Sequence, residues 1–254
     1  MLFSTAYFPP VEYFVLLARC SSAFVDSGEH YQKQSYRNRC TILTANGPMD
    51  LRFPIVHDGA RLITEVKVDW STPWLRQTEY AIDSAYYRSP FFEYYRDSLF
   101  SILDSRPETL WELNRRITEY FCLKIGIPAP VFDDASPFTM SRSVPSFTES
   151  RATMIAPVSC RQAGENFRCA SSHRDASLAV PPFTGSRATM VSPAWRQGGA
   201  EPGDDFRELI HPKRPPVLRN AEYWQVFRDK FGFVPNMSVM DLLFCEGPES
   251  ICYL

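Results

Sequence analysis

The residue types best suited to chemistry lie close together in a polar run at residues 29–39, between two short apolar stretches. The run contains His30, Lys33, Arg37 and Arg39. Arginine side chains suit phosphate because their donors form a fork, and a histidine can move a proton near neutral pH. The run therefore predicts an anion-binding site with His30 as its acid–base group.

Two further residues extend this candidate site. Asp26 lies just upstream and is a second candidate for the general base, while Asn38 adds a side-chain amide for substrate binding. On composition alone the same run also fits a solvated connector between two strands. The residues themselves leave both interpretations open.

A second candidate lies where a strand gives way to a helix, at residues 5–14. Pro9 and Pro10 end the strand, and Glu12 and Tyr13 fall in the first turn of the predicted helix. Ligands bind at helix N-termini along the carboxyl edge of a sheet, so Glu12 and Tyr13 are candidate substrate-binding residues. The alternative is an aromatic core with a turn fixed by proline.

Aromatic residues offer a third possibility. Trp70, Trp74, Tyr80 and the pair at 86–87 could stack on a sugar or a base, although aromatic residues at helical spacing also pack in cores.

The sequence lacks the motifs that would name a reaction. It has no phosphate-binding glycine loop, no dinucleotide fingerprint, no zinc-protease helix and no serine-nucleophile elbow. Its seven cysteines are scattered, without a C-x-x-C pair, so reduced thiols and no metal site are expected. No cofactor can be identified from these residues.

The apolar pattern predicts strands before helices. Strands are expected at 2–8, 23–26, 40–44, 51–56 and 62–69, with Asn46-Gly47 turning a hairpin. Helices are expected at 11–19, from Trp74, after a Ser89-Pro90 cap, after a capping box at Ser105 and Glu108 with Gly126 as its end, at 221–231 and, capped by Ser238 with Asp241, at 238–246. This order predicts an α/β or α+β fold in which helices pack on an N-terminal mixed sheet.

An internal repeat divides the chain. Residues 144–157 recur almost unchanged as 180–193, within a stretch rich in Ser, Thr, Pro, Gly and Arg. Such copies bury too little apolar surface to offset the entropy of ordering. We therefore expect one domain, made of 1–135 and 204–254, with 136–203 as a disordered insertion.

Charge and hydropathy limit the partners. The net charge is −2 and the pI is about 6.1, which gives no bulk attraction to nucleic acid or to an anionic membrane. No apolar stretch reaches the ~18 residues of a membrane span, and no signal peptide is evident. A cytoplasmic protein is expected.

The sequence resembles the WbqC-like proteins. The resemblance rests on the start at 7–14, the block from His30 to Arg39, the run at 89–95 and the tail at 232–244. It covers residues 2–135 and 204–250 and implies a bacterial cytosolic protein of surface-polysaccharide (O-antigen-like) synthesis.

Three hypotheses follow from the resemblance and the residues together. The first is a transferase acting on a nucleotide- or lipid-linked amino sugar, with Lys33, Arg37 and Arg39 on the phosphates and His30 or Asp26 as general base. The second is a non-enzymatic sugar-nucleotide-binding or scaffold protein. The third is a nucleotidyltransferase-like enzyme. The donor, the acceptor and the oligomeric state stay open.

Overall fold

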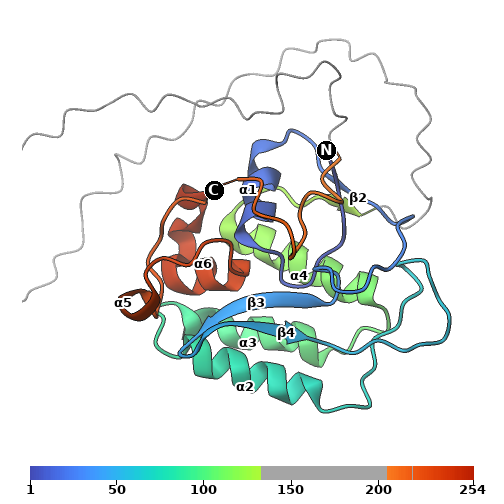
Figure 1. The fold of residues 1–254 in the computed structure, drawn as a ribbon, viewed down its shortest axis with the longest axis horizontal. Coiled ribbons are helices and arrows are strands. Elements are labelled where there is room, and N and C mark those ends of the chain that lie inside the picture. The colour runs from blue at the N-terminus through green and yellow to red at the C-terminus, as the bar shows by residue number, and fades with distance from the viewer. Residues whose placement is uncertain (133–204, 219) are drawn as a thin grey trace, which may run out of the picture. The chain divides into compact units, whose positions relative to one another are not determined.

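A small parallel sheet organises the N-terminal part of the protein (Figure 1). In the computed structural model, which describes residues 1–132, 205–218 and 220–254, strand β1 (Leu2–Phe3) leads through helix α1 (Val11–Arg19) to β2 (Phe24–Val25). Strand β2 pairs in parallel with both β1 and β5 (Val131–Phe132). Asp205 adds a parallel bridge to Leu2, so four segments run in the same direction.

The first strand is shorter than the predicted span of 2–8. It ends at Phe3, and the chain turns before α1, with Phe8 at a φ of 42°. The backbone amide of Tyr7 donates to the carbonyl of Tyr36 at 2.7 Å instead of to a neighbouring strand. The apolar residues of this stretch are therefore buried in a turn. The predicted strand was too long because apolar composition does not distinguish a buried turn from a buried strand.

The hairpin is confirmed, with a different start to its second strand. Strand β3 (Arg39–Thr44) pairs antiparallel with β4 (Gly47–Arg52), and Thr44 faces Gly47. The turn is thus made of residues 45 and 46, and Gly47 joins the ladder at a φ of 106°. Glycine adopts this left-handed conformation at little cost, so the chain can turn at residues 45 and 46 and resume pairing at Gly47. The strand therefore begins four residues before the predicted 51.

The strand predicted at 62–69 is wrong. This segment makes only isolated bridges, from Leu62 to His30, from Lys67 to Thr109 and from Val68 to Ile55. A turn in which the amide of Glu65 donates to the carbonyl of Leu62 interrupts the extended run. Its alternation of apolar residues reflects contacts with three different parts of the chain.

Three helices follow the hairpin: α2 (Trp74–Tyr86), α3 (Phe92–Asp104) and α4 (Leu110–Ile125). Helix α2 contacts β3 on one side of the hairpin, and α6 (Val239–Glu246) contacts the same strand (Figure 1). The predicted apolar stripe of α4 is confirmed, because its members are buried: Leu110, Leu113, Ile117, Phe121 and Ile125.

Two predicted helix caps lie at the wrong residues. Helix α4 begins after Thr109, whose hydroxyl accepts from the amide of Glu112, whereas Glu108 pairs with Lys67 at 2.6 Å. Ser89 does not cap α3, because its hydroxyl donates to the carbonyl of Tyr86. The end of α4 at Gly126 is confirmed, with a left-handed φ of 85°.

The C-terminal segment contains less helix than predicted. Of the span 221–231, only α5 (Arg228–Phe231) is helical, and before it the side chains of Tyr223 and Gln225 are bound to Asp241. Helix α6 is confirmed, with Ser238 as its cap, and η2 (Gly247–Tyr253) is a 3-10 helix that follows it. Asp241 does not complete a capping box, because its carboxylate binds Tyr223 and Gln225.

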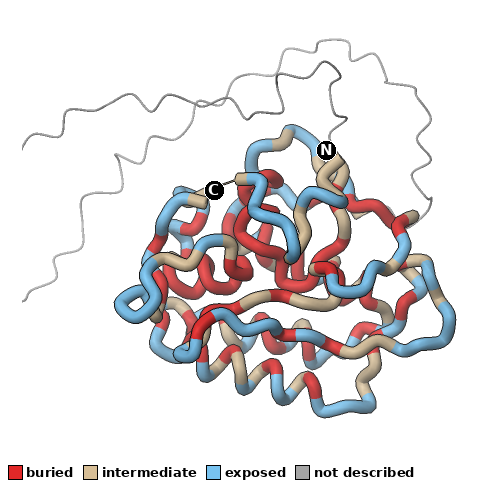
Figure 2. Tube along the Cα trace, in the orientation of Figure 1, coloured by how far each residue is buried: buried red, intermediate tan, exposed pale blue. Residues whose placement is uncertain are grey.

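The fold is α+β, as predicted, with the core where the helices meet the two small sheets. Buried residues concentrate in α1, α4 and α6, while much of the outer face of α2 is exposed (Figure 2). The repeat insertion predicted at 136–203 lies outside the described residues. No helix in the described part of the chain is long and apolar enough to cross a membrane.

Candidate functional site

The parallel segments bring polar residues together at one edge. Ser4 follows β1, Asp26 follows β2, and Phe206 and Arg207 follow the bridge at Asp205. Because the carboxyl ends of parallel strands meet at the same edge of a sheet, these residues share that edge, where open sheets bind ligands.

A buried ion pair forms the centre of this edge. Arg37 donates to the carboxylate of Glu29 at 2.5 Å, and both side chains are about 95% buried, with 4% and 5% exposed. The backbone amide of Thr5 donates to the other oxygen of Glu29 at 3.1 Å. Burial raises the pKa of Glu29, and the charge of Arg37 opposes that rise.

A second pair lies beside the first. Asp26 accepts from a terminal guanidinium nitrogen of Arg207 and, at 2.9 Å, from the amide of Gly28. Arg207 is held from its other side by Asp205 at 2.6 Å. Asp26 therefore fixes the arginine of a segment that is 181 residues away in the sequence.

Several contacts hold the polar run 29–39 against this edge. The side-chain amide of Asn114, on α4, donates to the carbonyl of Arg37 at 2.8 Å. The amide of Asn38, predicted to bind substrate, donates instead to the carbonyl of Phe53 at 3.0 Å. Asn38 thus ties the run to the segment that follows the hairpin.

A polar hollow of about 300 Å³ opens beside the two ion pairs. We call it the edge hollow. His30 is exposed on its wall. Its volume is at the lower end of the range for small-molecule sites, ~300–1,000 Å³. The hollow is lined by Gly28, Glu29, His30, Gln32, Arg37, Arg207 and Glu208.

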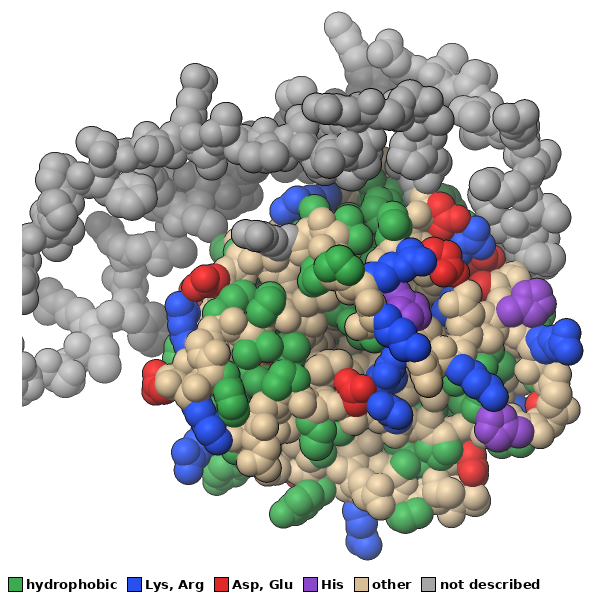
Figure 3. All heavy atoms as spheres, viewed as in Figure 1, with side chains coloured by type: hydrophobic (Ala, Val, Ile, Leu, Met, Phe, Trp, Pro, Cys, Tyr) green, Lys and Arg blue, Asp and Glu red, His purple; other side chains and the backbone are tan. Residues whose placement is uncertain are grey.

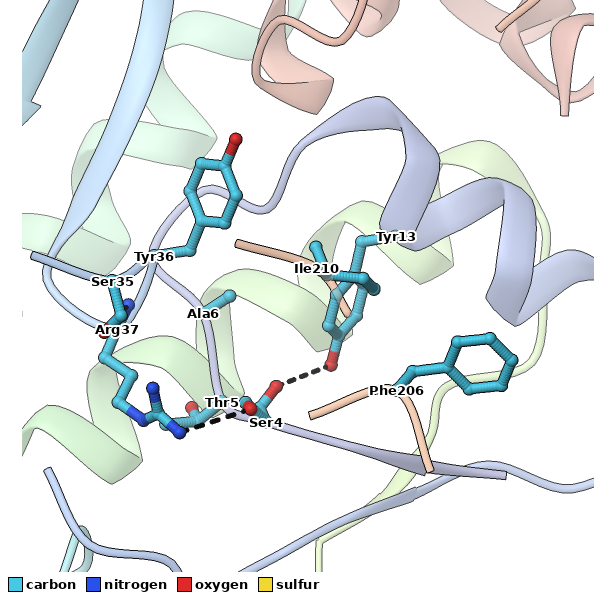
Figure 4. A pocket seen from close by; sticks show the side chains of 9 residues that line it. All are labelled: Ser4, Thr5, Ala6, Tyr13, Ser35, Tyr36, Arg37, Phe206 and Ile210. Carbon is cyan, nitrogen blue, oxygen red and sulfur yellow. Dashed lines mark hydrogen bonds between the residues drawn. The ribbon is translucent and has the colours of Figure 1, made fainter. Parts of the chain in front are cut away.

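An inner cavity of about 10 Å³ shares Arg37 with the edge hollow, and Figure 4 shows it from close by. Ser4 is at its centre: Arg37 donates to the Ser4 hydroxyl at 3.3 Å, and Tyr13 donates to the Ser4 carbonyl at 3.2 Å. The hydroxyl of Thr5 and Nε of Arg37 have no hydrogen-bond partner among the described residues. Unsatisfied buried groups are uncommon and often mark sites where a ligand or water binds.

Four basic side chains lie near one another and near Glu208, a lining residue of the edge hollow, and we call them the basic rim: Arg39, His211, Lys213 and Arg214. Lys213 and Arg39 both donate to Gln34, and Arg214 donates to the carbonyl of Glu208. Figure 3 shows Lys and Arg side chains gathered with a His on this face. Partial burial lowers the pKa of His211, and its cationic neighbours lower it further.

The helix N-terminus at 11–13 is not open to a ligand. The amide of Val11 donates to the carbonyl of Met237, and the amide of Glu12 donates to the side chain of Asn236. The carboxylate of Glu12, predicted to bind substrate, is buried and accepts from Asn236 and from the amide of Val217. Glu12 therefore anchors the C-terminal segment to α1.

The structure thus divides the residues predicted from the sequence into those that reach the candidate site and those that do not. It brings His30 and Arg37 to the edge hollow, Asp26 to the lining residue Arg207, and Arg39 to the basic rim, and Tyr13 reaches the inner cavity. Lys33 is exposed, and no bond joins it to another described residue. Asn38 and Glu12 face other segments.

Sequence reasoning missed the contribution of the C-terminal segment. Arg207, Glu208, His211, Lys213 and Arg214 all reach the site, although His211 had no predicted role. The available signal was the density of charged residues directly after the repeat region. Nothing in the sequence placed that segment beside residues 26–39.

The described residues also show how possible metal ligands and three buried thiols are placed. No group of three or more His, Cys, Asp or Glu side chains among them is arranged to hold a metal ion. Burial raises the pKa of the thiols of Cys40, Cys122 and Cys245, which makes them poor nucleophiles.

A comparison with known protein families agrees with the resemblance that the sequence motifs indicated. The family model described as the WbqC-like protein family matches residues 5–164, more than half of the chain. The chain belongs to the WbqC-like protein family. No curated protein and no solved structure gives a significant match. The matched region contains Asp26, His30 and Arg37, while the segment 205–214 lies beyond it.

Proposed function

We propose that this WbqC-like protein is a transferase of bacterial surface-polysaccharide synthesis that binds a phosphate-linked amino sugar in the edge hollow. One observation carries the proposal: a polar hollow of about 300 Å³ adjoins a rim of four basic side chains. The hollow is large enough for a sugar ring, and the rim supplies cationic donors beside it.

The basic rim would bind the phosphates. Arg39, Lys213 and Arg214 surround Gln34 and Glu208, and their mutual repulsion favours an anion between them. Lys33 is exposed in the same run and adds a further cation. Arg37 has a different role, because its guanidinium is already committed to Glu29, Gln32 and Ser4.

His30 would be the general base. Among the residues that the structure describes, it is the only histidine that lines the edge hollow, and it is exposed there. Its imidazole would take the proton from a sugar amine or hydroxyl as that group attacks the acyl carbon of a thioester donor, whose carbon–sulfur bond breaks so that the thiolate leaves and can accept the proton. Asp26, the other predicted base, instead holds Arg207 in place, because both of its oxygens already accept hydrogen bonds.

A binding protein without turnover is the second candidate. It is favoured by the surroundings of His30, since no hydrogen bond from another described side chain orients its ring. Catalytic histidines are commonly oriented by a third group, so this arrangement also fits a protein that only binds its ligand.

Calorimetric titration tests the location of the phosphates. UDP-N-acetylglucosamine should bind the full chain, and the Lys213→Ala/Arg214→Ala double variant should raise its Kd by about tenfold or more, equivalent to about 1.4 kcal/mol. The matched control is Lys67→Ala/Arg52→Ala, which removes two cations with 48% and 62% exposed side chains elsewhere. Equal affinity for both double variants would contradict the proposed rim.

A His30→Ala variant separates the two candidates. With nucleotide-linked amino sugars and acyl thioesters as substrates, mass spectrometry should detect a transferred group for the natural chain. His30→Ala should lose this turnover while keeping its Kd within about threefold. Tight binding of the sugar nucleotide with no product from the natural chain would favour the binding protein.

A further inference from the structure

A second groove lies on a different part of the molecule and shares no lining residue with the edge hollow. It has a volume of about 530 Å³ and lies between helix α2, the segment around Val226 and Phe227, and the hairpin turn at Ala45. One wall is formed by α2 and the two residues that follow it, with Tyr80, Asp83, Ser84, Ala85, Tyr87 and Arg88.

Two aromatic rings in this groove are exposed. Tyr80 and Tyr87 have 76% and 71% of their surfaces exposed, whereas Tyr86 between them is fully buried. They lie seven residues apart, or about two helical turns, so they follow each other along the same wall. Large aromatic rings left in water on a groove wall indicate a binding surface more than a packing role.

Unpaired polar groups accompany the rings. Ser84 and Arg88 are exposed, and no hydrogen bond or ion pair joins either side chain to another described residue. Asp83 is fixed, because both its oxygens accept from Arg96, at 2.6 and 2.9 Å. The wall thus combines aromatic faces with a free hydroxyl and a free guanidinium.

The opposite wall is rigidly held. Gln225 donates to the carbonyl of Val234 at 2.9 Å and accepts from its amide at 2.8 Å. Lys230 donates to the carbonyl of Ala45 at 2.6 Å, which links this segment to the hairpin turn. A wall held in place binds its ligand with a smaller loss of conformational entropy.

We infer that this groove binds a carbohydrate chain, separately from the sugar that is assigned to the edge hollow. A pyranose ring has apolar C–H faces and a polar hydroxyl edge, and the groove matches both with tyrosine rings and unpaired donors. Its volume of about 530 Å³ falls within the range of small-ligand sites, so two or three sugar rings fit better than a broad protein interface. The inference rests on the proposed function for the class of ligand.

Titration with phosphate-free oligosaccharides tests this site. The full chain is titrated with a panel of trisaccharides, including chitotriose and maltotriose, and binding is followed by calorimetry and by saturation-transfer NMR. The Tyr80→Ala/Tyr87→Ala variant should raise the Kd by about tenfold or more. The matched control is Tyr94→Ala, which removes a ring that is 75% exposed on α3 and does not line the groove.

The outcomes separate this inference from the proposed function. Binding of a trisaccharide that is lost with Tyr80→Ala/Tyr87→Ala and kept with Tyr94→Ala supports the groove. The same double variant should leave the Kd for UDP-N-acetylglucosamine unchanged, because that ligand is assigned to the edge hollow. The inference is overturned if no trisaccharide binds at millimolar concentration, or if the Kd of a bound trisaccharide is the same for the natural chain and for Tyr80→Ala/Tyr87→Ala. Trisaccharide binding without sugar-nucleotide binding would support the groove as a carbohydrate site and contradict the edge hollow as a sugar-nucleotide site.

Discussion

Each buried carboxylate discussed above has its own partners, and those partners decide what the residue does. Glu29 is paired with Arg37 and Asp26 with Arg207, whereas Asp241 accepts hydrogen bonds from the neutral side chains of Tyr223 and Gln225. A charge buried with a counter-ion and a charge buried among neutral donors respond differently to substitution and to pH.

Arg37→Ala should destabilise the protein by about 3–5 kcal/mol, because it leaves the Glu29 carboxylate buried without its counter-ion. The measurement is the free energy of unfolding from urea denaturation. Arg52→Ala is the control, since Arg52 also pairs with a carboxylate but is 62% exposed, and its loss should cost less than about 1 kcal/mol. Similar losses of unfolding free energy for both variants would show that the ion pair of Arg37 and Glu29 contributes no more to stability than an exposed pair does.

Asp241 should make the protein less stable as the pH rises from about 4 to about 6. Burial raises the pKa of Asp241 from 3.8 to about 6, so the folded state holds a proton that the unfolded state has released. Between these pH values ionisation is penalised only in the folded state, and the loss of stability amounts to about 3 kcal/mol.

Asp241→Asn should remove this dependence. An amide cannot ionise, and its oxygen can still accept from Tyr223 and Gln225. The difference in unfolding free energy between Asp241→Asn and the natural chain should therefore move in favour of the variant as the pH rises, and level off above about pH 6. Asp97→Asn, at a side chain that is 89% exposed, should show no such trend. A difference that stays constant with pH would refute the raised pKa.

At the residue scale, the sequence predicted which residue types reach the candidate site better than it predicted their hydrogen-bond partners. Its polar run did supply Arg37 and His30 to the candidate site. It did not indicate that Asn38 and Glu12 bind backbone and amide groups of remote segments, because such bonds depend on which segments fold side by side.

At the element scale, local signals located the elements whose determinants are local. The hairpin and the helices α1, α4 and α6 follow from turn residues, apolar stripes and end signals. The spans 62–69 and 221–231 were misassigned because long-range contacts override their patterns. The bonds of Tyr223 and Gln225 to Asp241 hold these residues outside a helix, although their sequence pattern is helical.

The cap of α4 offers a direct test at this scale. Thr109→Ala should cost about 1 kcal/mol of unfolding free energy, because the amide of Glu112 loses the hydroxyl that accepts from it. Ser105→Ala, at the residue that the sequence favoured as the cap, should cost less than about 0.5 kcal/mol. Thermal unfolding of the two variants measures this difference, and the reverse order would place the cap at Ser105.

At the scale of the whole molecule, the candidate site combines two remote parts of the chain. Residues 4–39 supply the floor and one wall, and residues 205–214 supply the other wall and most of the basic rim. The family match at 5–164 includes residues 5–39 of the first part and none of the second. The α+β class could be predicted from the order of elements, but the pairing of Asp205 with Leu2 that closes the site could not.

A crystal structure of the full chain with UDP-N-acetylglucosamine would test the central claim most directly. The diphosphate should lie within hydrogen-bonding distance of Arg39, Lys213 and Arg214, with the sugar ring in the edge hollow beside His30. A sugar nucleotide bound anywhere else, including the groove at Tyr80 and Tyr87, would contradict the assignment of the site.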